Sequence, residues 1–152
     1  MAGLAACTPG TLEALTGSCG ITAPVGASDA AQAYAAAVNA STPGWEKIDA
    51  NIEVSGNMVH RSDLRLQIKT DARFALNLRD IEFPPDAAPA GETLIAAVEE
   101  YGAFLQHGYD DWDFYVVSDV EGTRLNENRA GASAHLRDLL DLPPSTCVYR
   151  RP

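Results

Sequence analysis

The stretch Trp45–Val54, which reads WEKIDANIEV, carries the most weight for the fold. From Ile48 onward, apolar and polar side chains alternate along it. A period of two is typical of a half-buried β-strand, because successive side chains of a strand point to opposite faces of the sheet. The Ser55-Gly56-Asn57 sequence after it is a turn signal. The pattern therefore predicts a strand that ends near Val54.

Two further segments show the same alternation. Leu64 to Ile68 places apolar residues at every second position, and the pattern resumes from Phe74 to Leu78 after a predicted turn at 70–72. The outward positions carry a row of basic residues, which we expect to pair with acids on neighbouring strands. Together the three segments predict an antiparallel meander with one apolar and one polar face.

Helical patterns flank this meander. An alanine-rich segment over 28–39 predicts a helix that Thr42-Pro43-Gly44 ends, and residues 92–107 carry an apolar stripe at helical spacing. A strand over 113–120, a hairpin turn at Glu121-Gly122, a short strand near Arg124 and a last helix over 130–141 complete the order α-β-β-β-α-β-β-α. We expect one α+β domain over residues 28–152. Its sheet would be mainly antiparallel, with four or five strands and helices on one face. Residues 1–27 would form a loop-rich N-terminal segment.

Charge and cysteine content restrict the function classes. The chain has 152 residues and a formal net charge of −10, which disfavours direct binding to nucleic acid. No apolar run reaches the roughly 18 residues of a membrane span. Leu4-Ala5-Ala6-Cys7 resembles a lipoprotein cleavage box, but no basic or long apolar segment precedes it. We therefore expect a cytoplasmic protein, with Cys7, Cys19 and Cys147 reduced.

The segment between Arg79 and Arg124 contains no lysine or arginine. An electronegative surface of this kind steers basic partners, whereas a purely solvated face keeps a protein soluble, and both interpretations stay open here. Trp112 among acids favours a binding hot spot, and its alternative role is to pack into the core. The acids of the segment are Asp80, Glu82, Asp86, Glu92, Glu99, Glu100, Asp110, Asp111, Asp113, Asp119 and Glu121.

The residues that we expect to bind a partner lie in the second half of this segment. They are Glu99, Glu100, Asp110, Asp111, Trp112, Asp113, Asp119 and Glu121. No motif for a metal, a cofactor or a catalytic residue accompanies them, so none is predicted. We find no apolar strip beyond what a sheet would cover and therefore expect a monomer.

Trp45-Glu46-Lys47-Ile48 opening a meander, and Trp112 leading a strand that ends in Glu121-Gly122, resemble the YezG-like family of bacterial immunity proteins. The resemblance spans roughly residues 30–128. It implies an α+β fold, no catalysis and a cognate toxin whose basic site the acids would occlude. Element order, size and acidity are also similar to class I chaperones of type III secretion, which bind effectors as dimers. A small α+β enzyme is a third hypothesis.

Overall fold

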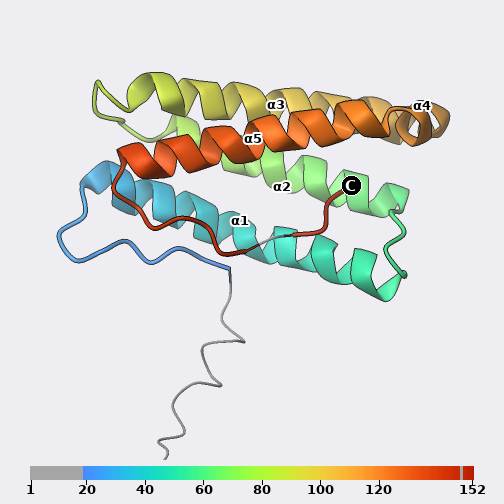
Figure 1. Ribbon diagram of the computed structural model, residues 1–152, viewed down its shortest axis with the longest axis horizontal. Coiled ribbons are helices and arrows are strands. Elements are labelled where there is room, and N and C mark those ends of the chain that lie inside the picture. The colour runs from blue at the N-terminus through green and yellow to red at the C-terminus, as the bar shows by residue number, and fades with distance from the viewer. Residues whose placement is uncertain (1–18, 148) are drawn as a thin grey trace, which may run out of the picture.

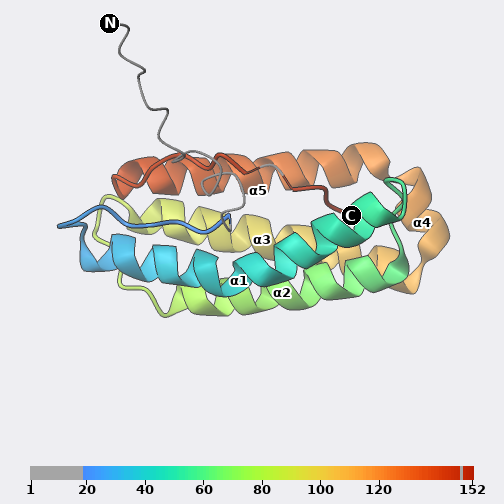
Figure 2. The ribbon, with the colours of Figure 1, turned by 90° about the horizontal axis from the view of Figure 1, so that it is seen from below.

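The computed structural model describes residues 19–147 and 149–152, and this part of the chain contains five helices and no strand. The predicted α+β fold and its antiparallel sheet are therefore wrong. The helices are α1 (Asp29–Val54), α2 (Arg61–Arg79), α3 (Ala88–Asp110), α4 (Trp112–Val117) and α5 (Asp119–Leu139). The four long helices lie alongside one another and alternate in direction, while short α4 turns the chain at one end (Figures 1 and 2). The molecule is a four-helix bundle.

Helix α1 includes the stretch that predicted a strand. Its buried residues there are Trp45, Ile48 and Ile52, spaced three and four apart as on one face of a helix. Ala50 and Val54, which completed the alternation, are exposed, and Val54 keeps 88% of its surface. The alternation was therefore a coincidence between a helical face and two solvent-facing apolar residues.

The predicted break at 42–44 is also wrong, because α1 continues through Pro43. Proline removes one helical hydrogen bond and costs about 3 kcal/mol in a helix interior. Packing offsets this cost, since Thr42 and Trp45 on either side are buried. Gly44 marks a close crossing of α1 and α2, because a Cβ atom there would clash with the side chain of Thr70.

Helix α2 replaces the second and third predicted strands. Its buried face contains Leu64, Phe74 and Leu78, but also Gln67 and Asp71. These two residues interrupt the apolar helical stripe, and Asp63 is a third buried polar residue at the start of the helix, so the remaining apolar positions imitate the alternation of a strand. Leu76, assigned to the inner face of a strand, is 54% exposed.

In the second half of the chain, some predicted secondary-structure elements are confirmed and others are wrong. The helices expected over 92–107 and 130–141 are confirmed as parts of α3 and α5. The strand over 113–120 is wrong: the Asp111 carboxylate accepts the backbone N–H of Phe114 and caps α4. The Glu121-Gly122 hairpin is wrong too, because both residues lie in the first turn of α5. Gly122 allows α5 to pack on Phe104, whose ring would lie 2.8 Å from a Cβ atom there.

A buried polar cluster joins three of the long helices. The carboxylate of Asp71 accepts hydrogen bonds from Trp45 Nε1 of α1 at 2.9 Å and from Gln67 Nε2 of its own helix at 2.7 Å. It also pairs with Arg129 Nη1 of α5 at 3.1 Å, and the two side chains keep only 1% and 7% of their surface. The cluster fixes the rotation of α5 relative to α1 and α2.

Replacing Asp71 with Asn should lower the free energy of unfolding by about 3–5 kcal/mol, because it leaves the Arg129 charge buried without a counter-ion. Urea denaturation followed by circular dichroism measures the change. Asp49→Asn is the matched control, since Asp49 pairs with Arg150 at 3.3 Å near the surface and should cost less than about 1 kcal/mol. Equal losses in the two variants would contradict the central role of Asp71.

Candidate functional site

At the seam between α1 and α5, the bundle lacks close helix–helix packing, and another part of the chain lies there. The closely packed long helices are α1 with α2, α2 with α3, and α3 with α5, whereas α1 and α5 are not among the closely packed pairs. The C-terminal segment, residues 140–147 and 149–152, leaves the end of α5 and runs back along the seam between α1 and α5 (Figure 1). It stands where a fourth helix–helix interface would otherwise lie.

Several contacts hold this segment in place. A disulfide joins Cys147 to Cys19, which precedes α1, across 128 positions of sequence. The backbone N–H of Arg150 donates to Asp49 of α1 at 2.6 Å, and the hydroxyl of Tyr101 donates to the main-chain oxygen of Pro152. The expectation that these two cysteines are reduced is therefore wrong for the structure. The pairing could not be seen in the sequence, because the fold brings Cys19, which precedes α1, next to Cys147, which follows α5.

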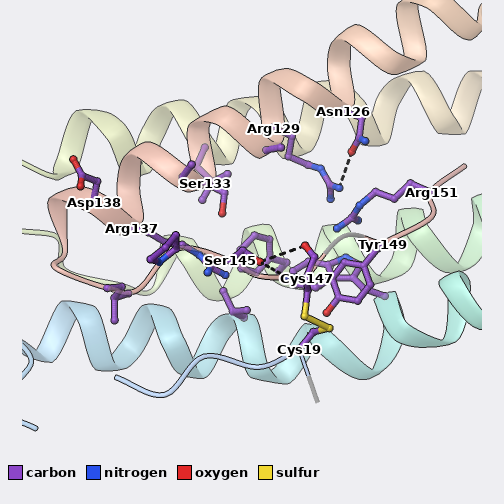
Figure 3. Close-up of a pocket in the computed structure, with 18 residues that line it drawn as sticks. Cys19, Asn126, Arg129, Ser133, Arg137, Asp138, Ser145, Cys147, Tyr149 and Arg151 are labelled. Atoms are coloured by element: carbon purple, nitrogen blue, oxygen red, sulfur yellow. Dashed lines mark hydrogen bonds between the residues drawn. A yellow bond between two sulfur atoms is a disulfide. The ribbon is translucent and has the colours of Figure 1, made fainter. Parts of the chain in front are cut away.

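A cavity of about 560 Å³ lies under the segment. Its inner wall is apolar and comes from Val38 of α1, Phe74 of α2 and Leu94 of α3. Its outer wall comes from α5 and the C-terminal segment and carries the polar groups, among them Asn126, Arg129, Ser133, Arg137, Ser145, Tyr149 and Arg151 (Figure 3). Both the volume and the mixture of apolar and polar walls are typical of ligand-binding cavities.

Arginine side chains dominate the electrostatics of this cavity. Arg129 and Arg137 are buried, with 6% and 7% of their surface exposed. Figure 3 shows the guanidinium groups of Arg129 and Arg151 pointing toward one another from α5 and from the C-terminal segment. Within the described residues, the N–H groups at Arg129 Nε, Arg137 Nε and Arg151 Nη1 are buried without a hydrogen-bond partner. Buried donors without a protein partner are uncommon in folded proteins, and these three N–H groups are available to an acceptor that enters the cavity.

The charges of the cavity do not balance. Arg129 is neutralised by Asp71, but neither Arg137 nor Arg151 has a carboxylate within 4.0 Å among the described residues. Arg151 lies instead over the rings of Trp45 and Tyr149, at 5.4 and 5.2 Å. Asp138 also lines the cavity but is exposed at its rim. The walls therefore present an excess of positive charge in a protein whose net charge is −10.

The pKa shifts reflect this imbalance. Burial lowers the pKa of Arg151 to about 10, and the nearby charge of Arg129 acts in the same direction. Burial also raises the pKa of Tyr101 to about 12, against the opposing effect of the two arginines. At neutral pH Arg151 is still charged and Tyr101 is neutral, so the cavity offers hydrogen-bond donors to an anion.

The residues predicted to bind a partner lie elsewhere and are only partly brought together. Asp113, Asp119 and Glu121 are exposed around α4 and the start of α5, at one end of the bundle. Glu121 pairs with Arg124 at 2.6 Å, and this hydrogen bond lowers the pKa of Glu121. Glu99 pairs with Arg79 of α2.

The remaining predicted residues have structural roles or no described partner. Asp111 caps α4, and Asp110 accepts from Gln106 at 3.0 Å within α3. Trp112 is half-buried, packs 5.1 Å from the ring of Tyr115 and lies under the guanidinium of Arg61 at 5.7 Å. Packing into the hydrophobic core, the alternative weighed for Trp112, therefore accounts for its contacts. Glu100 is exposed on α3.

The arginine-lined cavity was not predicted from the sequence. The signal that could have revealed it is the spacing of Arg129, Ser133 and Arg137, which repeats every four residues and so lies on one helical face. The described residues contain no group of three or more His, Cys, Asp and Glu side chains that could hold a metal ion. None of the described helices is long and apolar enough to cross a lipid bilayer.

Comparison of the chain with protein-family models, with curated proteins and with solved structures gives no match. The immunity function that the sequence resemblance implied thus stays a prediction, while the sheet that the resemblance also implied is absent from the described residues.

The Cys19–Cys147 disulfide should stabilise the bundle by about 2–4 kcal/mol, because it closes a long loop in the unfolded chain. Cys147→Ser should lower the urea midpoint accordingly, and a reductant should lower the midpoint of the wild-type protein to the same value. Cys7→Ser, which leaves the described bond intact, is the control. A wild-type protein whose midpoint is insensitive to reductant would contradict the prediction.

Proposed function

We propose that this protein is a binding protein for a small anionic ligand, which it holds in the cavity between α1, α5 and the C-terminal segment. One observation carries the proposal: two guanidinium charges, Arg137 and Arg151, face a 560 Å³ cavity without a counter-ion among the described residues. Enclosing an unpaired charge costs several kcal/mol, and a bound anion would offset that cost. Guanidinium groups bind carboxylates and phosphates through two parallel hydrogen bonds.

The cavity favours binding over catalysis as the primary role. The groups that face it are mainly guanidinium, amide and hydroxyl groups, which orient an anion by donating hydrogen bonds. The Asp71 carboxylate nearby already accepts hydrogen bonds from Trp45, Gln67 and Arg129 and is not free to act as a base. These arrangements support a rigid receptor for an anion.

The disulfide also supports a location outside the cytoplasm. Structural disulfides persist in oxidising compartments and are rare in the cytoplasm, so the bond between Cys19 and Cys147 favours an exported protein over the cytoplasmic one expected from sequence. Fractionation of cells, with immunodetection of the protein in each fraction, tests the compartment.

Replacing Arg151 with Gln should weaken binding of an anionic ligand about tenfold to a hundredfold, because a charge-assisted hydrogen bond contributes about 1.5–3 kcal/mol. Thermal unfolding in the presence of a panel of carboxylates, phosphates and sulfonates, each beside its uncharged amide or alcohol, measures the effect. A ligand present at a hundred times its dissociation constant should add about 2.7 kcal/mol to the stability of the wild type.

Arg150→Gln is the matched control for this experiment. Arg150 is the neighbouring residue on the same segment, but it pairs with Asp49 and Glu53 at the surface of α1. It should leave anion binding unchanged, whereas Arg137→Gln should weaken it as Arg151→Gln does. If no anion of the panel shifts the unfolding temperature of the wild type more than its neutral counterpart, the proposed function is wrong.

A second candidate function is partner binding through the α4 end of the bundle, as the sequence and its resemblance to immunity proteins suggest. Val116, Val117 and Val120 are 61%, 80% and 84% exposed there, and exposed acids lie among them. Apolar side chains ringed by acids would suit a protein with a basic and apolar segment, such as a toxin or a secreted effector. We call this surface the acidic α4 end.

Replacing both Val117 and Val120 with Ser should weaken binding of a basic amphipathic peptide at the acidic α4 end by at least about tenfold, since each removes exposed apolar surface from the contact. Fluorescence anisotropy with a labelled Lys/Leu peptide, at low and high salt, measures binding. Val25→Ser is the control because Val25 is fully exposed at the opposite, N-terminal end of α1. Equal affinity of all three proteins for the peptide would leave the acidic α4 end as a solvated surface.

A further inference from the structure

The two walls of the cavity differ in chemistry, and this difference restricts the ligand. Val38, Phe74 and Leu94 are buried side chains of the bundle core and present only carbon to the cavity. The cationic side chains that line the cavity, Arg129, Arg137 and Arg151, come from α5 and the C-terminal segment, and Arg151 lies over the ring of Trp45 of α1. A ligand that satisfies both walls has an anionic group on one side and an apolar body on the other.

The volume of the cavity also argues against a small inorganic anion. A volume of 560 Å³ corresponds to roughly eighteen water-sized volumes. Phosphate or acetate would fill a small part of it and leave the apolar wall in contact with water, which is unfavourable. An organic acid with a body of about ten carbon atoms would reach the guanidinium groups and also cover apolar side chains of the cavity.

From these observations we infer that the ligand is an amphiphilic organic acid, such as a medium-chain fatty acid. Its anionic head is held by Arg137 and Arg151, and its apolar body lies against α1, α2 and α3. The inference rests on the proposed function and adds the class of ligand. The C-terminal segment covers part of the cavity from outside, so the acid binds as a free molecule and not as part of a membrane surface.

A chain-length series tests the inference. Isothermal titration of the wild-type protein with hexanoate, octanoate and decanoate, below their micelle concentrations, should show affinity that rises about fourfold for each added methylene group. Decanol and decylammonium match decanoate in their apolar body but lack the anionic head. Decanol should bind at least about tenfold more weakly than decanoate, and decylammonium should not bind.

Two variants separate the cavity from the rest of the surface. Ala134 is exposed on α5 and lines the cavity, so Ala134→Trp should obstruct the cavity while leaving every arginine in place. Ala96 is exposed on α3 and does not line the cavity, which makes Ala96→Trp the matched control. Decanoate should bind the control as it binds the wild type and should bind Ala134→Trp at least about tenfold more weakly.

The outcomes distinguish this inference from the proposed function. If acetate or inorganic phosphate binds as tightly as decanoate, an anion site stands and the amphiphilic ligand is wrong. If decanol binds as tightly as decanoate and Arg151→Gln changes nothing, anion recognition fails together with the inference. Binding only to phosphatidylglycerol vesicles, with none to free decanoate, would overturn the cavity site. Should Ala134→Trp fail to fold, the chain-length series in the wild type decides alone.

Discussion

The buried ion pair between Asp71 and Arg129 is the constraint on which the rest of the structure depends. A carboxylate with 1% of its surface exposed is tolerated only when it is paired and hydrogen-bonded, and its partners come from α1, α2 and α5. Satisfying Asp71 therefore sets the rotation of α5. Because Ser133 and Arg137 follow Arg129 at intervals of four residues, the same rotation directs them to the seam between α5 and α1.

The protein has a net negative charge, but the side chains around this cavity carry an excess of positive charge. The two are compatible because electrostatic interactions weaken with distance. Exposed acids more than about 8 Å from an anion act through water and salt, which screen them at physiological ionic strength. Arg137 and Arg151 act at contact distance in a poorly hydrated site, where a charge interaction is several times stronger than in water. The surface acids thus slow the approach of an anion more than they weaken its final binding, and short-range contacts decide affinity.

Sequence periodicity identified α3, whose buried stripe is apolar, and failed in α2, whose buried face is partly polar, and in α1, where the exposed Ala50 and Val54 completed an alternation. The stripe of Leu94, Val98, Tyr101 and Leu105 predicted α3 correctly because each of these residues is buried. In α2, Gln67 and Asp71 occupy buried positions, so the hydrophobic pattern lost its helical period and imitated a strand. The polar cluster that organises the bundle is thus the feature that misled the prediction for α2. The cavity was missed for a related reason: its arginines come from α5 and from a segment that no local pattern places beside α5.

The C-terminal segment connects stability to ligand binding. It brings Arg151 against Trp45 and Tyr149. Burial there lowers the pKa of Arg151, which means that keeping its guanidinium charged in the unliganded protein costs free energy. The disulfide to Cys19, the hydrogen bond from the backbone N–H of Arg150 to Asp49 and the Tyr101–Pro152 hydrogen bond supply the free energy that keeps the segment in place, and Arg150→Gln retains all three. An anion that pairs with Arg151 removes part of the cost and stabilises the docked segment. Linkage is reciprocal, so contacts that dock the segment must also strengthen anion binding, even when they lie outside the cavity.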